Sequence, residues 1–307
     1  MTIDMDPLTT LLSVAIPLMA PLVWAMLGET ISERGGVLNV GLEGAVLLGA
    51  WGSAVGYSQT GAWGIGILTG LATGVITGGA LAYLYVWRGV DQVIGGVILN
   101  LLAVGLTTAL WTSMQGAASV ANAPRLPVPF LSDIPVLGAI FSQNLLVYGA
   151  IVGAPVLLLL LDRTRWGLRL KAAGEAPEAL DAAGVSVRRV RTLAVVAGTT
   201  LGALGGVTIG LTSASGGFVP SMSAGVGYIA LAVVILVRWH PVLGLMAALV
   251  FGLLQALQYQ SQTFTWLAAL PSELVLALPY LAAIVVVALS RAARYPAAMG
   301  VPWRVGR

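Results

Sequence analysis

The sequence predicts an all-α, polytopic membrane protein. Of its 307 residues, 58% are hydrophobic and 9% are charged, and the mean hydropathy is +0.94. Soluble domains carry about 25% charged residues, so this chain has too few to cover a surface that faces water. Its 39 glycines suit the close approach of helices in lipid. It has no Cys, which excludes disulfides and thiolate metal sites.

Apolar segments follow one another along most of the chain, and a membrane span needs about 20 such residues. We expect about nine spans, with eight or ten as alternatives, at 8–28, 36–57, 61–86, 92–113, 143–161, 192–212, 222–237, 242–258 and 272–290. The segments between 222 and 258 are short. Gly225, Gly227 and Pro241 interrupt them, so they are candidates for broken or re-entrant helices.

The basic residues predict the orientation, because cytoplasmic loops carry an excess of Lys and Arg. If residues 162–191 are cytoplasmic and nine spans alternate, 14 of the 15 basic residues lie inside and only Arg125 lies outside. The N-terminus is then expected outside and the C-terminus in the cytoplasm. The net charge of +3 therefore reflects topology, and no nucleic-acid partner is expected.

Two loops stand out in this topology. Residues 114–142 form a Pro-rich external segment, and residues 162–191 form the longest cytoplasmic segment. Within the latter, Pro177 suits the first position of a helix and Gly184 the position just past its end. Glu175 and Glu178 are expected at the N-terminal end of this short surface helix, where its dipole favours anions. The loop is either a docking element for a cytosolic protein or a simple connector.

Polar residues within the spans are the candidates for the translocation path. Glu43 lies inside the second expected span, where a carboxylate needs a partner or a cavity. Asn39 precedes it by four residues and so is expected on the same helix face. Asn100 is a second buried amide, in the fourth span. Each of the three either lines the path or holds the spans together by hydrogen bonds.

The sequence carries none of the residue patterns of a catalytic or metal centre. His240 is the only histidine, so a His-based metal or catalytic cluster is excluded. No phosphate-binding loop, zincin motif or serine elbow is present. We therefore expect no catalytic residues, no metal and no cofactor, which disfavours an intramembrane enzyme.

Three motifs carry a resemblance to a known family. They are Glu33-Arg-x-Gly-x-Leu-Asn-x-Gly-x-Glu-Gly-Ala45, Gln92-Val-Ile-Gly-Gly-Val-Ile-Leu-Asn100 and Gly167-Leu-Arg-Leu-Lys-Ala-Ala-Gly-Glu175. The chain resembles permeases of the branched-chain amino acid, simple sugar and nucleoside ABC importers, most closely the smaller permease of bacterial nucleoside importers. Residues 221–241, which end in Arg238-Trp-His-Pro, resemble the family's later spans, although Val226 and Val237 stand where Arg and Gly are usual.

The resemblance implies a single transmembrane permease domain over residues 1–307, in a bacterial inner membrane. It implies three kinds of partner: a second, different permease, cytosolic ATP-binding subunits and an external solute-binding lipoprotein. The spacing of Glu178-Ala179 and Gly184 is similar to that of the family's ATPase-contacting loop. The residues expected at that contact are Gly174, Glu175, Glu178, Ala179 and Gly184.

We therefore expect the permease subunit of an ABC importer for a small polar solute, with nucleosides favoured. A neutral solute needs hydrogen-bonding groups rather than fixed membrane charges. A sugar or branched-chain amino acid permease is the first alternative. An ion-coupled secondary transporter is the second, although Glu43 would have to supply its whole relay.

Overall fold

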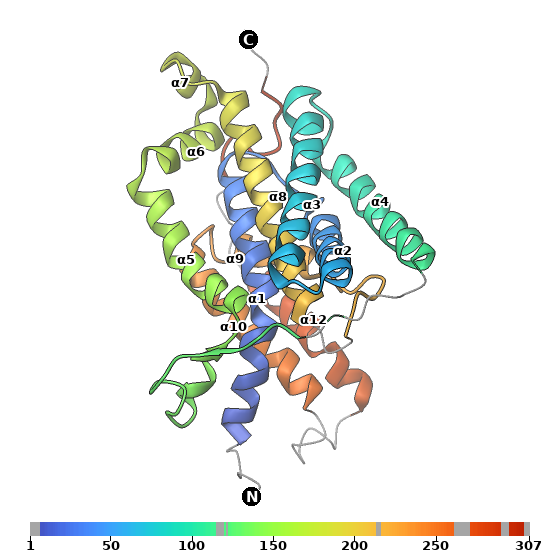
Figure 1. Ribbon diagram of the computed structural model, residues 1–307. Helices are drawn as coiled ribbons and strands as arrows, with labels where there is room; N and C mark the ends of the chain where they lie inside the picture. Colours follow the sequence, from blue (N-terminus) through green and yellow to red (C-terminus); the bar gives the residue numbers. More distant parts are fainter. Residues whose placement is uncertain are drawn as a thin grey trace, which may run out of the picture.

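The computed structural model describes residues 7–114, 120, 122–212, 216–260, 271–289 and 295–303. Nearly all of its regular structure is helical (Figure 1). The larger helices are α1 (Pro7–Arg34), α2 (Leu42–Thr60), α3 (Trp63–Ala82), α4 (Gln92–Ser113), α5 (Leu145–Arg163), α8 (Val187–Thr212), α10 (Pro241–Tyr259) and α12 (Ser272–Leu289). The shorter elements are η1 (Tyr83–Trp87), β1 (Leu126–Pro127), η2 (Leu137–Ala139), β2 (Ser142–Gln143), α6 (Arg165–Glu175), α7 (Pro177–Ala182) and α9 (Val226–Leu236).

The predicted all-α membrane fold is confirmed. Within the described ranges, six helices are long and apolar enough to cross a membrane: α1, α3 with η1, α4, α5, α8 and α10. The other three expected spans correspond to α2, α9 and α12. β1 and β2 pair antiparallel through only two residues each, next to the start of α5.

Helix α8 lies at the centre of the bundle and packs against α1, α2 and α3. Small residues on α8 permit this close packing. A Cβ added to Gly206 would lie 1.8 Å from the carbonyl oxygen of Val46, and one added to Gly205 would lie 2.6 Å from that of Pro21. Close backbone approach of this kind is how helices gain contact in lipid, where no hydrophobic effect drives them together.

The second expected span, 36–57, becomes helical only at Leu42. Helix α1 ends at Arg34 and α2 begins only at Leu42, so residues 35–41 form irregular backbone between them. Gly36 has a φ of +85°, a conformation that favours glycine. This irregular segment is called the interruption below.

The seventh expected span, 222–237, contains a half-helix. Helix α9 has 11 residues, a length of about 16 Å, roughly half the thickness of a hydrocarbon core. The turn that leads into it has left-handed φ values at Ser221, Ala224 and Gly225. The predicted break at Gly225–Gly227 is confirmed at its first residue, and Pro241 begins α10, as the sequence indicated.

The described parts of the two expected loops lie toward opposite ends of the bundle (Figure 1). Helices α6 and α7 and the start of α8 lie at one end, together with residues 295–303. The β1–β2 pair lies toward the other end, as does the start of α1. Apart from Arg125, which precedes β1, the basic residues of the described ranges lie in α6, at the ends of α1 and α5, at the start of α8, or shortly after η1 and α9.

Candidate functional site

The interruption leaves backbone N–H groups without helical partners, and buried side chains accept their hydrogen bonds. Gln92 Oε1 accepts from Leu38 N (2.7 Å), and Glu29 Oε1 accepts from Asn39 N (2.9 Å). Glu29 and Gln92 are both buried. Because no water solvates a span from within lipid, irregular backbone is tolerated there only when protein groups or a water-filled cavity satisfy it.

Asn39 lies in this irregular segment and not in a helix. Its amide Nδ2 donates to Thr199 Oγ1 (3.0 Å), near the middle of α8, and the residue is fully buried. The expectation that Asn39 and Glu43 share a helix face is therefore wrong, because α2 begins at Leu42. The four-residue spacing has its usual meaning only where both residues are helical.

Glu43 joins the two interrupted spans to each other. It lies in the first turn of α2, and its carboxylate accepts hydrogen bonds from Gly225 N (2.9 Å) and Gly227 N (2.7 Å), at the start of α9. The N-terminus of a helix presents unpaired N–H groups and a partial positive charge, so a carboxylate there is well placed. Gly227 is required by this contact, since an added Cβ would lie 2.5 Å from Glu43 N.

Asn100 completes the network from α4. Its Oδ1 accepts from Gly44 N (2.8 Å), and its Nδ2 donates to Val40 O (2.9 Å) and to the hydroxyl oxygen of Tyr228 (2.8 Å). One side chain thereby contacts the interruption, the start of α2 and the half-helix. The structure thus brings Asn100 and Glu43 together around α9, whereas Asn39 faces α8 on the other side of the interruption.

Two side chains of this network are partly accessible. Tyr228 is 48% exposed, and Glu43 is half-buried, while Asn39 and Asn100 are buried. Sequence reasoning missed Tyr228, because a lone tyrosine in an apolar helix gives no signal of its hydroxyl partner. It also missed Glu29 and Glu33, one helical turn apart and both fully buried. Glu33 accepts a hydrogen bond from Trp239 Nε1.

The second group of candidate residues lies at the α6–α7 end. The short surface helix expected to begin at Pro177 and to end before Gly184 is α7, and a further helix, α6, precedes it and meets it at Ala176. Glu175 is therefore the last residue of α6, not the start of a helix. Pro177 is at the first position of α7 and Glu178 is in its first turn, as predicted. Glu175, Glu178 and Ala179 are exposed, and Leu180 is buried beneath them.

Gly184 ends α7 as predicted. Its φ is +76°, its N–H donates to Asp181 O (2.8 Å), and Val185 N donates to Leu180 O (3.2 Å). These two bonds make a Schellman motif, in which the left-handed position favours glycine. The residue is exposed, and a Cβ there would meet nothing within 4 Å, so the backbone conformation alone restricts it.

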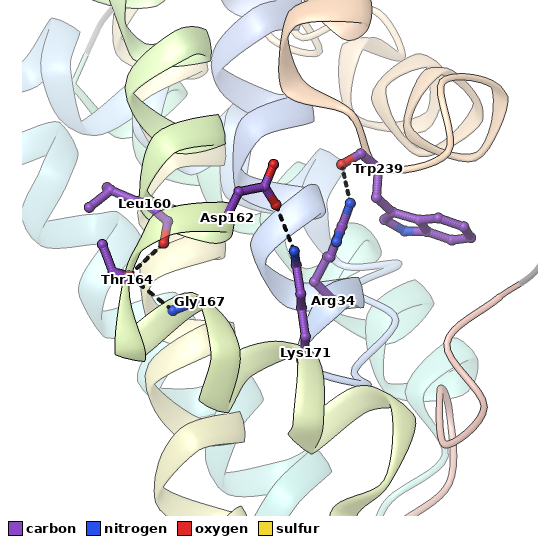
Figure 2. A network of polar contacts seen from close by, with 7 residues as sticks. All are labelled: Arg34, Leu160, Asp162, Thr164, Gly167, Lys171 and Trp239. Carbon is purple, nitrogen blue, oxygen red and sulfur yellow. Dashed lines mark hydrogen bonds and ion pairs between the residues drawn. The ribbon is translucent and has the colours of Figure 1, made fainter.

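An ion pair joins helix α6 to the end of α5, beside the end of α1 (Figure 2). Lys171 Nζ pairs with Asp162 Oδ1 at 2.6 Å, and Thr164 Oγ1, at the start of α6, accepts from Gly167 N (3.1 Å). Arg34 Nη2 donates to Trp239 O (3.0 Å) beside this corner. Gly174, which is buried, touches α1 directly, because an added Cβ would lie 2.4 Å from Arg34 O.

Not all basic residues of this loop face outward. Arginines next to a span usually anchor it at the lipid headgroups, and Arg188, Arg189 and Arg191 lie at the start of α8. Arg191 is instead 2% exposed, and its guanidinium donates to backbone carbonyl oxygens. Helix α8 begins at Val187, so the three arginines point to different sides of its first turns. Arg189 is exposed, and Arg188 lies over the ring of Trp87.

Comparison with known proteins assigns the family. Residues 11–289 match the family described as the branched-chain amino acid transport system permease component. A putative glucose ABC transporter permease protein of Haloferax volcanii is 38% identical over 260 residues (83% of this chain, 78% of the relative). A nucleoside ABC transporter permease protein of Lactococcus lactis is 34% identical over 280 residues (88% of each chain). A guanosine ABC transporter permease protein of Bacillus subtilis is 34% identical over 303 residues (94% of each).

A second permease protein from each of these organisms also matches, at 27%, 25% and 26% identity respectively. No solved structure matches the chain. The family match spans most of the chain, and the relatives align over most of their own length. The chain therefore belongs to the branched-chain amino acid transport system permease family and is a membrane-spanning permease subunit of an ATP-binding cassette importer.

Proposed function

We propose that this permease imports nucleosides along a path beside Glu43 and Tyr228. The observation that carries the proposal is the partial exposure of two polar side chains, Glu43 and Tyr228, where the start of α2 meets the start of α9. A carboxylate or phenol exposed to lipid at this depth is costly, so such groups usually face a cavity or another protein. The irregular backbone at 35–41 and 216–225 also needs protein groups or a water-filled cavity to satisfy its hydrogen bonds.

The chemistry of this group suits a neutral solute with an aromatic face. The Tyr228 ring offers a stacking surface, and the Tyr228 hydroxyl and Glu43 offer hydrogen-bonding groups, as a nucleobase and ribose require. Asn39 and Asn100 are buried, so we assign them the supporting role of holding the interruption in place. Among the described residues, no Lys or Arg lies beside Glu43 to receive the carboxylate of an amino acid.

The relatives support this solute class and also a second candidate. Two of them are named for nucleosides or guanosine, at 34% identity. The relative named for glucose is 38% identical and supports a sugar as the alternative. Sugars also stack on aromatic rings, so the side chains alone do not separate these two solute classes.

We further propose that the permease assembles with a different permease chain. Its support is that three organisms each have two permeases similar to this chain, one at 34–38% and one at 25–27% identity. An ABC importer also needs ATP-binding subunits and a solute-binding protein. The exposed face of α7, with Glu178, Ala179 and Gly184, is the proposed ATPase contact, and Gly174 holds α6 against α1 behind it.

The proposed orientation in the inner membrane places the α6–α7 end in the cytoplasm. In this Cys-free chain, Asp133→Cys, near the β1–β2 pair, should react with an impermeant thiol reagent added outside intact cells. Ser186→Cys, just before α8, should react only after the cells are opened. Both positions are exposed, so accessibility within the fold does not decide the result. Labelling of Ser186→Cys alone from outside would reverse the topology.

The proposed ATPase contact predicts that Gly184→Val disrupts coupling. A β-branched residue in the left-handed region costs about 1–2 kcal/mol, so the end of α7 should rearrange. We expect the permease to insert normally but to bind the ATPase weakly and to lose solute-stimulated ATP hydrolysis. Gly61→Val is the matched control, because Gly61 has a similar φ of +68° and open space around it but ends α2. Equal solute-stimulated ATP hydrolysis in the two variants would show that the loop is only a connector.

The proposed path predicts that Glu43→Gln lowers transport more than stability. The amide oxygen keeps one of the two bonds to α9, while the amide nitrogen opposes the other N–H, at a cost of about 1–3 kcal/mol. Glu43→Leu leaves both N–H groups unpaired and should lower the melting temperature further. Thr107→Val is the control, because buried Thr107 bonds only within α4. Normal transport by well-folded Glu43→Leu protein would remove Glu43 from the path.

The proposed solute class is tested by competition. In the assembled importer, uptake of labelled adenosine should be inhibited by unlabelled purine and pyrimidine nucleosides, and not by glucose or leucine. Inhibition by glucose alone would support the sugar alternative.

The same assay with Tyr228 variants tests the stacking surface. Tyr228→Phe retains the ring and loses only the bond to Asn100, so it should keep most uptake. Tyr228→Ala should lose about 10-fold or more, because stacking on one base contributes about 1–3 kcal/mol. Equal uptake by both variants would exclude Tyr228 from solute binding.

A further inference from the structure

Residues 295–303, called the strap below, fold back across the α6–α7 end of the bundle. Ala298 N donates to Gly174 O (2.8 Å), at the end of α6, and Gly300 N donates to Gly36 O (3.2 Å), in the interruption. The ring of Tyr295 packs edge-on against Trp239, with 5.7 Å between the ring centroids. The strap therefore joins α6, the interruption and the turn between α9 and α10.

Arg191 holds the strap in place by hydrogen bonds. Its Nη1 donates to Val301 O (2.6 Å), and its Nη2 donates to Ala298 O (3.2 Å) and to Ala173 O (3.0 Å). Its Nε is buried with no hydrogen-bond partner, and no ion pair is found for it among the described residues. Burying a guanidinium among carbonyl groups, without a carboxylate, is costly. That cost indicates that Arg191 has a role at this position beyond packing.

The strap bonds to both sides of the contact between the end of α6 and the start of the interruption. Gly174 touches Arg34 O, and a Cβ on Gly174 would also lie 3.1 Å from Gly36 N. The strap holds Gly174 through Ala298 and holds Gly36 through Gly300, two residues further along the chain. From Gly36, the interruption runs on to Asn39, whose N–H bonds to Glu29, and then to Glu43.

A cleft of about 760 Å³ separates α7 from the strap. It is lined by Pro177 and Ala179 on one side and by Ala297, Val301 and Trp303 on the other, with Arg191 among its lining residues. The strap still reaches α7, because Trp303 packs against the cluster of Ala173, Leu180 and Val187. Gly174, the strap and Arg191, whose Nη2 lies beside Gly36, connect this end of the bundle to the interruption.

We propose that the strap couples the ATPase to the translocation path, with Arg191 as its positioning residue. Displacement of α6 and α7 moves Gly174. The strap keeps Gly36 in step with Gly174, so the interruption moves with them and shifts the groups beside Glu43. This inference rests on the proposed function for the ATPase contact and the path, but it does not depend on which solute is carried.

The test uses the complete importer in proteoliposomes, with labelled adenosine as the solute. Arg191→Gln removes the charge and most of the donors, and Arg191→Lys keeps the charge but presents a single ammonium to the three carbonyl groups. A truncation after Arg294 removes the strap altogether. Arg189→Gln is the control, because Arg189 is exposed on the same turn of α8.

We expect Arg191→Gln and the truncation to bind the ATPase and to keep basal ATP hydrolysis. Solute stimulation and uptake should fall about fivefold or more, the lower end of typical coupling between two sites. Arg191→Lys should be intermediate, and Arg189→Gln should match the unmodified importer. This pattern differs from that of Gly184→Val, which should lose ATPase binding itself.

Two results would overturn the proposal. One is solute stimulation in Arg191→Gln and in the truncated protein that stays near that of the unmodified importer. The other is failure of both variants to insert and assemble, which would make the strap a brace required for folding. If adenosine fails to stimulate even the unmodified importer, the nucleoside assignment fails instead. The same variants then test the strap with whichever of glucose or leucine does stimulate.

Discussion

The structure depends on one constraint: backbone groups that leave a helix inside a membrane must find partners within the protein. The interruption at 35–41 and the start of α9 both leave backbone N–H groups without helical partners. A small set of side chains supplies those partners. Gln92, Glu29 and Asn100 accept from the interruption and the start of α2, and Glu43 accepts from the start of α9.

This arrangement also explains where a permease can form a path. A continuous helix offers a solute only its side chains, whereas an interrupted one adds backbone groups and helix ends. Here the end of the interruption and the start of α9 meet at Glu43, and the half-exposed Tyr228 lies beside them. The same interruption reaches the α6–α7 end through Gly36, where Gly174 and the strap contact it. The interruption therefore connects the proposed path to the proposed ATPase contact.

The sequence predicted the features that depend on residues close together in the chain. Hydropathy predicted the all-α membrane fold, Pro177 and Gly184 marked the ends of α7, and Gly225 marked the start of the half-helix. Glu43, Asn39 and Asn100 were recognised as polar residues within spans, but their partners were not. The missed features all depend on contacts between distant segments. Asn39 lies outside α2, Arg191 is turned inward to the strap, and the hydroxyl of Tyr228 bonds to Asn100, which is 128 residues away in the chain.

The most direct test of this account is a cryo-electron microscopy structure of the assembled importer with a nucleoside bound. The account predicts solute density against the ring of Tyr228 and within hydrogen-bond reach of the network around Glu43. It also predicts that residues 35–41 remain irregular in the complex. Lipid covering Tyr228, with the solute bound elsewhere, would contradict it, as would a continuous helix through 35–41.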